Sequence, residues 1–195
     1  MIQNLMHKLW EAQSFVFVCF SLLEPIIRIF GLPKRVMRPF EEFVKAGYVV
    51  ADIGCSRGYL TLPLAELVGP EGKVYAVDLN RKCIRALEKR VKKGGYRNIE
   101  SHASSAADLS FIEDSSVDFV LASGLLCSMP HDRQLFVSEI KRILKPTGHA
   151  YLSLGAGPPF GFVDRTEWEN ILEGFRLEQE GRWQKGWAVV SVKQD

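Results

Sequence analysis

The stretch 49–59 constrains the fold of this chain more than any other. It opens on an apolar run, 49–51, which is too short for a helix and is typical of a buried parallel strand. An acidic residue, Asp52, then stands at the end of this strand. Gly54 and Gly58 follow, and apolar residues at helical spacing begin at Leu60. Glycine lets a backbone approach a ligand closely, and a helix N-terminus attracts anions. The pattern therefore predicts a strand, a turn and a helix of the kind that holds a nucleotide.

An acidic residue follows the next predicted strand. The apolar stretch 73–77 ends in Asp78, an acid that suits the two hydroxyls of a ribose. A dinucleotide fingerprint beginning at Gly54 would need glycine where the chain has Ser56 and Tyr59, which disfavours NAD and FAD. No Gly-Lys-Ser/Thr follows, so the phosphate-binding loop of nucleotide triphosphatases is excluded. A dehydrogenase is thus a disfavoured alternative.

Three segments together resemble a known family. Asp52-Ile-Gly-Cys-Ser-Arg-Gly58 resembles motif I, D/E-x-G-x-G-x-G, of the S-adenosylmethionine (SAM)-dependent methyltransferases of the Rossmann-like class, with Ser56 at the middle glycine. The stretch 104–109 resembles the family's G-D-A-x-x-L segment, with Ser105 in place of the acid and Asp108 as a substitute carboxylate. The stretch 145–148 resembles the L-K-P-G-G turn of small-molecule methyltransferases.

The resemblance covers about residues 40–195 and implies the fold. We expect an α/β, Rossmann-like, doubly wound and mostly parallel sheet of seven strands, one of them antiparallel. Strands are expected over 99–103, 117–123 and 149–154, with a closing antiparallel pair over 175–183 and 186–192. Helices are expected over 58–68, 80–93 and 132–144, and a further helix begins at a capping box formed by Asp164 and Glu167.

The resemblance also implies the cofactor and its contacts. The cofactor is SAM, and the product is S-adenosylhomocysteine. The glycine-rich turn is expected to hold the methionine part, Asp78 the ribose, and the segment at Ser105 the adenine. The residues expected at the cofactor are Asp52, Gly54, Cys55, Ser56, Gly58, Asp78, Leu79, Ser105, Ala106 and Ser123. A direct in-line attack of the acceptor on the methyl needs neither a protein nucleophile nor a metal, so no metal site is predicted.

The residues after the fourth predicted strand should flank the methyl group. Many members of the family have a pair of histidines here, where this chain has Cys127 and Ser128, with His131 beyond them. Cys127 is either a catalytic thiol or a small buried side chain, and His131 is either a base or an ordinary residue at a helix start. Both alternatives stay open, and the catalytic residue is left unassigned.

Residues 1–40 form a predicted helical extension, and residues 41–195 form the methyltransferase domain. The uncharged run 12–23 is about half of the ~20 residues needed to span a bilayer. One hypothesis makes this segment a cap on the domain. The other makes residues 1–31 an interfacial helix on a membrane, with basic side chains near the headgroups.

Net charge and cysteine content bear on whether the protein binds nucleic acid and on the compartment in which it is expected. A net charge of +2 is too small to argue for nucleic acid, and the basic side of the helix over 80–93 is interpreted as a solvated face. The four scattered cysteines favour a reducing, cytoplasmic environment, with a peripheral membrane location as the alternative. The predicted function is methyl transfer to a small acceptor, apolar or lipid-like. The alternatives are a non-catalytic or partner-dependent SAM-binding protein and a membrane-associated lipid methyltransferase.

Overall fold

The computed structural model describes residues 37–126, 129, 132–154, 163–181 and 186–193. The predicted N-terminal helix, Cys127, His131 and the loop over 155–162 lie outside these residues. The chain divides into two compact units, residues 1–38 and residues 39–195, and the second unit holds the elements described below. Within the described part, no helix is both long enough and apolar enough to cross a bilayer.

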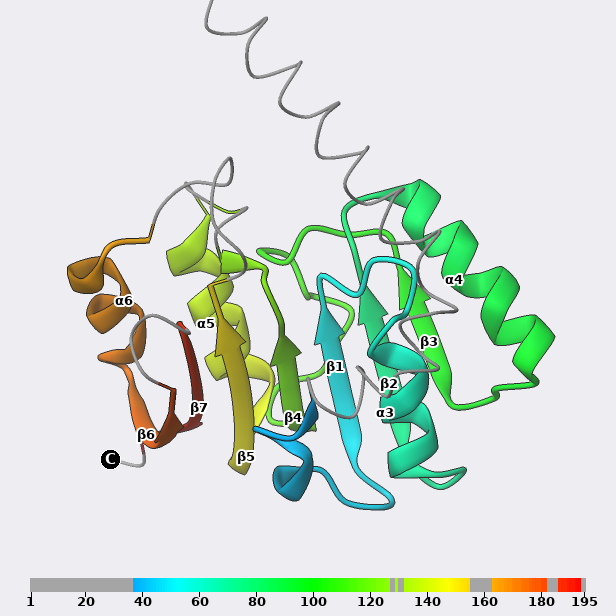
Figure 1. Ribbon diagram of the computed structural model, residues 1–195, viewed down its shortest axis with the longest axis horizontal. Coiled ribbons are helices and arrows are strands. Elements are labelled where there is room, and N and C mark those ends of the chain that lie inside the picture. The colour runs from blue at the N-terminus through cyan, green and yellow to red at the C-terminus, as the bar shows by residue number, and fades with distance from the viewer. Residues whose placement is uncertain (1–36, 127–128, 130–131, 155–162, 182–185, 194–195) are drawn as a thin grey trace, which may run out of the picture. The chain divides into compact units, whose positions relative to one another are not determined.

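Seven strands form one sheet in the order β3-β2-β1-β4-β5-β7-β6 (Figure 1). β1 to β5 pair in parallel, while β7 lies antiparallel to both β5 and β6. This arrangement confirms the predicted seven-stranded sheet with one reversed strand. The strands are β1 (Val49–Ile53), β2 (Lys73–Val77), β3 (Ile99–His102), β4 (Val117–Ala122), β5 (Leu144–Ser153), β6 (Phe175–Glu180) and β7 (Trp187–Val192).

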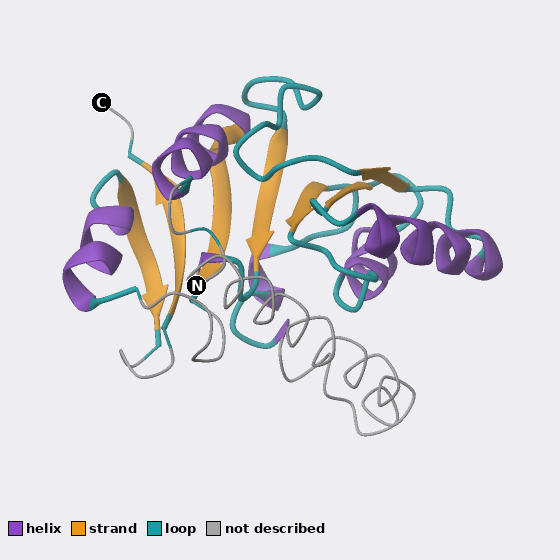
Figure 2. Ribbon diagram, turned by 90° about the horizontal axis from the view of Figure 1, so that it is seen from above, coloured by secondary structure: helices purple, strands orange, loops and turns teal. Residues whose placement is uncertain are grey.

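Helices lie on both sides of the sheet, as Figure 2 shows from above. The apolar side chains of α3 and α4 share one buried cluster with Ala76 of β2. Those of α5 and α6 share a second cluster with residues such as Ala51 and Val77, which face the opposite side because side chains alternate along a strand. The fold is thus doubly wound. The helices are α3 (Thr61–Val68), α4 (Arg81–Gly94), α5 (Arg133–Ile143) and α6 (Arg165–Leu172), with a 3-10 turn, η1 (Glu41–Phe43), before β1.

The connection from β3 to β4 contains no helix. Residues 103–116 run in turns, and Phe111 stacks on the ring of His102 at 3.9 Å between centroids. Arg142 of α5 fixes this segment by donating to the backbone oxygens of Leu109 and Ile112, at 2.9 and 2.8 Å. Leu109 and Ile112 are fully buried in the core cluster under α5, so this segment packs on the sheet without a helix, and Arg142 holds its backbone in place.

Two predicted boundaries differ from the structure. The helix expected from Gly58 begins at Thr61, because Gly58 has a φ of +82° and cannot be helical. The expected turn over 145–148 lies within β5, which begins at Leu144. Val117 pairs with Leu144 while Phe119 pairs with His149, so the residues between 144 and 149 bulge out of the ladder.

The two predicted helix starts at Asp164 and Asp132 use their side chains differently. Asp164 accepts a bond of 2.8 Å from the backbone N–H of Glu167, which confirms the first half of the capping box. Glu167 does not complete the box, because its carboxylate pairs with Arg133 instead. Asp132 stands at the N-cap of α5 without a capping bond from its side chain.

Candidate functional site

Asp52 is the last residue but one of β1, and the other predicted cofactor residues follow the carboxyl ends of β1, β2, β3 and β4. These four strands are adjacent and parallel, so their carboxyl ends meet at one edge of the sheet. From β1 the chain adds β2 and then β3 toward one edge of the sheet. It then returns to β4, on the other side of β1, and adds β5 toward the opposite edge. The strand order therefore reverses between β1 and β4, and open α/β sheets bind ligands at such a switch point.

The turn after β1 is fixed against β2. The backbone N–H groups of Gly54 and Cys55 donate to the carbonyl oxygen of Val77, at 2.8 and 3.0 Å. Gly54 has a φ of +82°, and a Cβ built there would lie 3.1 Å from Cδ1 of Leu125, in the loop after β4. The backbone of the turn thus lies directly beside the loop that follows β4, at the switch point.

Gly58 is required by packing as well as by conformation. Its φ is also +82°, and an added Cβ would lie 2.4 Å from Cδ1 of Leu87 in α4. This glycine lets α4 pack closely against the turn. The motif's last glycine therefore sets the distance between the turn and the helix that follows β2.

Ser56 takes the backbone conformation expected of the glycine that it replaces. Its φ is +49°, in the left-handed region that L side chains rarely adopt. Its N–H donates to Oδ2 of Asp78 at 2.8 Å, and its hydroxyl lies 4.0 Å from the sulfur of Cys83 in α4. The hydrogen bond to Asp78 thus stabilises a strained residue in the middle of the motif.

Asp78 is held at both carboxylate oxygens. Oδ2 accepts from Ser56, and Oδ1 accepts from the N–H of Asn80 at 2.8 Å. Burial raises the pKa of Asp78, and these two bonds oppose that rise. Each oxygen has a second lone pair, so the fixed carboxylate can still accept bonds from hydroxyl groups. Leu79 beside it is 69% exposed, an unusual state for a large apolar side chain.

Asp52 lies beneath the turn and is almost fully buried. Its Oδ2 accepts a bond of 2.6 Å from the hydroxyl of Thr61, which joins the end of β1 to the first turn of α3. Burial raises the pKa of Asp52 to about 7, the Thr61 bond lowers it, and the charge of Asp78 raises it. Burial also raises the pKa of the Cys55 thiol strongly, so this side chain stays neutral and acts in packing.

The segment after β3 is a turn in which side chains accept hydrogen bonds from nearby backbone N–H groups. The Ser105 hydroxyl accepts from the N–H of Ala107 at 3.1 Å. Asp108 is exposed, and its carboxylate accepts from the N–H of Ser110 at 3.3 Å. Ala106 is partly buried against the cluster under α5. Ser105 and Ala106 are the third and fourth residues after the end of β3.

Ser123 directly follows β4 and is half-buried, and the N–H of Gly124 after it donates to the Ser153 hydroxyl at 2.8 Å. The loop after β4 is also held by Arg133. The Nε of Arg133 donates to the Leu126 oxygen at 2.9 Å, and its Nη1 pairs with Glu167 of α6.

Sequence reasoning missed Arg133. It is only 6% exposed, and within the described part its Nη2 is buried without a hydrogen-bond partner. A signal was present, because Arg133 precedes Phe136 and Ile140 at helical spacing and so falls on the buried side of α5. Since charged side chains are rarely buried there, this position pointed to a tertiary role.

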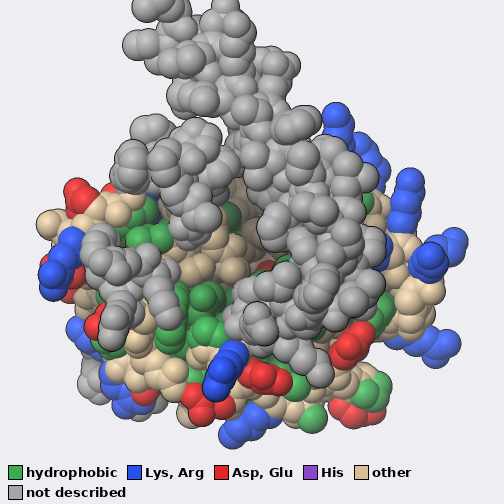
Figure 3. Space-filling model, in the orientation of Figure 1, with side chains coloured by type: hydrophobic (Ala, Val, Ile, Leu, Met, Phe, Trp, Pro, Cys, Tyr) green, Lys and Arg blue, Asp and Glu red, His purple; other side chains and the backbone are tan. Residues whose placement is uncertain are grey.

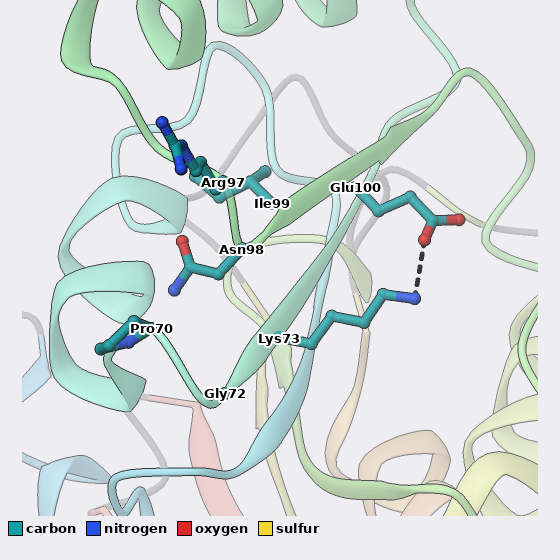
Figure 4. A pocket seen from close by; sticks show the side chains of 7 residues that line it. All are labelled: Pro70, Gly72, Lys73, Arg97, Asn98, Ile99 and Glu100. Carbon is teal, nitrogen blue, oxygen red and sulfur yellow. Dashed lines mark ion pairs between the residues drawn. The ribbon is translucent and has the colours of Figure 1, made fainter.

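A separate hollow of about 400 Å³ lies at the opposite end of β2 and β3 (Figure 4). Lys73 begins β2, whereas Asp78 follows the end of that strand. Lys73 and Glu100 form an ion pair of 2.7 Å beside the hollow. This hollow does not belong to the candidate site. Its lining residues are Pro70, Gly72, Lys73, Arg97, Asn98, Ile99 and Glu100.

Solved structures resemble this fold over most of the chain. A SAM-dependent methyltransferase from Aquifex aeolicus superposes with a TM-score of 0.67 at 26% identity, over 82% of this chain and 88% of that one. A putative rRNA-methylase from Clostridium thermocellum superposes with a TM-score of 0.70 at 20% identity, over 83% of this chain and 96% of that one. The second likeness concerns the fold alone.

Curated relatives match the central part of the chain. A demethylmenaquinone methyltransferase from Geobacillus stearothermophilus is 36% identical over 115 residues, which are 59% of this chain and 47% of that protein. This chain spans about half the length of the curated relatives that it matches. The sequence model of a family described as "Methyltransferase domain" matches residues 50–148, from β1 into the bulge of β5. The chain therefore belongs to the methyltransferase-domain family of class I, SAM-dependent methyltransferases.

Proposed function

We propose that this protein transfers the methyl group of SAM to a small, apolar or lipid-like acceptor by direct in-line displacement. The observation that carries the proposal is the joining of the motif I turn to the acid after β2. Ser56 and Asp78 meet at the carboxyl edge of the sheet, inside the segment that the family model matches. The family uses SAM, and this edge is where an open α/β sheet binds its ligand.

The residues at this edge fit SAM in chemical type. The carboxylate of Asp78 is fixed and has lone pairs left for the two ribose hydroxyls. Leu79 and Ala106 offer apolar surface to an adenine ring, and Ser105 offers a hydroxyl beside it. The turn from Gly54 to Gly58 would hold the methionine part, with Asp52 anchoring the turn through Thr61 from beneath. Cys55 would support the turn from inside the core, and Ser123 would stand at the rim toward the acceptor.

When bound, SAM supplies an activated methyl group on a sulfonium. The chain's own residues then have to orient the acceptor and exclude water, because proximity and alignment provide most of the acceleration in such a transfer. Leu125 contributes an apolar side chain beside Gly54 at the switch point. Arg133 holds the neighbouring backbone in place through the Leu126 oxygen. Cys127 and His131 remain the candidates for a direct role toward the acceptor.

The acceptor class is supported by the relatives. The Geobacillus relative is a demethylmenaquinone methyltransferase, and demethylmenaquinone is a lipid-like small molecule. We propose an acceptor of this kind for this protein: a small molecule of apolar, lipid-like character.

The test is methyl transfer from radiolabelled SAM into a cell extract that is then separated into lipid, small polar, protein and RNA pools. We expect label in the lipid pool with the unaltered chain and a large loss of label with the Asp78→Ala variant. Label confined to protein or RNA would contradict the proposed acceptor. Binding of SAM without label in any pool would favour a non-catalytic or partner-dependent SAM-binding protein.

A further inference from the structure

The outer face of α4 carries a dense row of basic side chains, here named the basic stripe. At 100° per residue the members of the stripe fall within about 120° of the helix circumference. The stripe lies opposite the buried side of the helix, which is formed by Ile84 and Leu87. The stripe consists of Arg81, Lys82, Arg85, Lys89, Lys92 and Lys93, all of them exposed.

The charge of this helix stands apart from that of the rest of the chain. α4 holds seven basic residues and one acidic residue, Glu88, and so carries a net charge of +6. The whole chain carries +2, so the residues outside α4 carry −4 together. Within the described part, no member of the basic stripe forms an ion pair. The small net charge of the protein therefore conceals a strongly cationic face.

Figure 3 shows Lys and Arg side chains gathered along the side of the molecule where Figure 1 draws α4. An apolar side chain accompanies them. Leu79 is 69% exposed and directly precedes Asn80, whose side chain caps α4 by accepting from the N–H of Lys82 at 2.9 Å. The same helix end therefore presents cations and an exposed aliphatic group, a combination that suits the interface of a bilayer.

We propose that the basic stripe docks the protein onto a membrane surface that contains anionic phospholipids. Each Lys or Arg near such a surface is attracted by the headgroups, and six of them on one face act together. A nucleic acid is the less suitable partner, because α4 contains no aromatic side chain on which a base could stack. Membrane binding is a property separate from methyl transfer, because it requires neither SAM nor an acceptor.

The position of the stripe relates it to the candidate site. α4 begins three residues after Asp78, so its first turn adjoins the carboxyl edge of the sheet. A protein docked through this face holds that edge next to the bilayer. An apolar acceptor dissolved in the membrane then lies close to the site that would methylate it.

The experiment is cosedimentation of the full chain with lipid vesicles in the absence of SAM. We expect binding to mixed phosphatidylglycerol–phosphatidylcholine vesicles that weakens as salt is added, and much weaker binding to pure phosphatidylcholine. In the variant with Lys82, Arg85, Lys89 and Lys92 all changed to Gln, affinity should fall by about fivefold per side chain at low salt.

The matched control changes Lys45, Arg165, Arg176 and Lys193 to Gln, which removes the same charge from exposed positions outside α4. This control should bind the mixed vesicles within a few-fold of the unaltered chain. Equal losses in both variants would overturn the proposal, because net charge alone would then explain binding. Unchanged binding of the α4 variant would also overturn it and assign membrane contact to residues elsewhere, such as 1–31. Tighter binding to single-stranded RNA than to the mixed vesicles would favour a nucleic acid.

Discussion

The backbone N–H of Ser56 donates a hydrogen bond of 2.8 Å to Oδ2 of Asp78, 22 residues further along the chain. This bond joins two features that the sequence presents separately, the glycine-rich turn and the acid after the next strand. It also explains how serine can replace glycine at a φ of +49°, since the partner at Asp78 offsets part of the conformational cost. If SAM binds at Asp78 as we propose, this pair couples cofactor binding to stability.

Replacing Asp78 by Ala should weaken SAM binding by about 1–3 kcal/mol, because ribose hydroxyls would lose their acceptor and the turn would lose its anchor. Isothermal titration calorimetry of the purified variant measures the loss. The control is Glu71→Ala, which removes an exposed carboxylate before β2, at the opposite end of that strand from Asp78. Equal SAM affinity of the Asp78→Ala variant and the unaltered chain would refute the ribose assignment.

Replacing Ser56 by Val should both destabilise the protein by about 1–2 kcal/mol and weaken SAM binding, because a β-branched side chain tolerates a positive φ poorly. Urea unfolding and calorimetry report the two effects. Ser115→Val is the matched control, since Ser115 has a φ of +50° in an exposed turn just before β4, at the end of that strand opposite the candidate site. It should lose similar stability and keep its SAM affinity. Loss of affinity in both variants would contradict a local role for Ser56.

Asp52 should make stability depend on pH in a defined direction. Its folded pKa of about 7 lies above its ordinary value of 3.8, so the folded protein binds the proton more tightly than the unfolded chain. The contribution to stability is complete below about pH 4 and is lost as pH rises toward 7, at no more than about 1.4 kcal/mol per pH unit. The Asp52→Asn variant should lack this slope.

Urea unfolding of both proteins between pH 5 and pH 8, without SAM, measures the difference in slope. The unaltered chain should lose stability relative to Asp52→Asn across that range. A difference between the unaltered chain and Asp52→Asn that stays constant with pH would show that Asp52 is ionised in the folded protein throughout.

Replacing Gly58 by Ala should cost about 2–4 kcal/mol of unfolding free energy, because conformational strain adds to a clash with Leu87. The added Cβ would lie 2.4 Å from the Leu87 side chain. Gly47→Ala separates the two causes, since Gly47 has nearly the same φ, +81°, and nothing within 4 Å of an added Cβ. It should lose only about 1–2 kcal/mol. Equal losses in the two variants would exclude the packing contribution.

Local patterns predicted most of the fold. Short apolar runs and helical spacing of apolar residues are properties of neighbouring residues, so the sequence alone shows them. They predicted the bounds of β2 correctly and both ends of α4 to within one residue. The order and direction of the strands followed from the family resemblance, and right-handed crossover supports the parallel part. Boundaries at Gly58 and Leu144 were wrong, because a positive φ and a strand bulge depend on how neighbouring strands meet.

The sequence by itself determined which residue types stand at the strand ends: the acids, the glycines and the serine at position 56. Only the tertiary structure decided how they are used. In the folded protein Ser56 donates a hydrogen bond to Asp78, and Thr61 donates one to Asp52. Arg133 is buried there, where it contacts both the loop after β4 and α6. The physical reason is distance along the chain: a hydrogen bond between residues 22 or 34 positions apart exists only after the sheet has brought their strands and helices together.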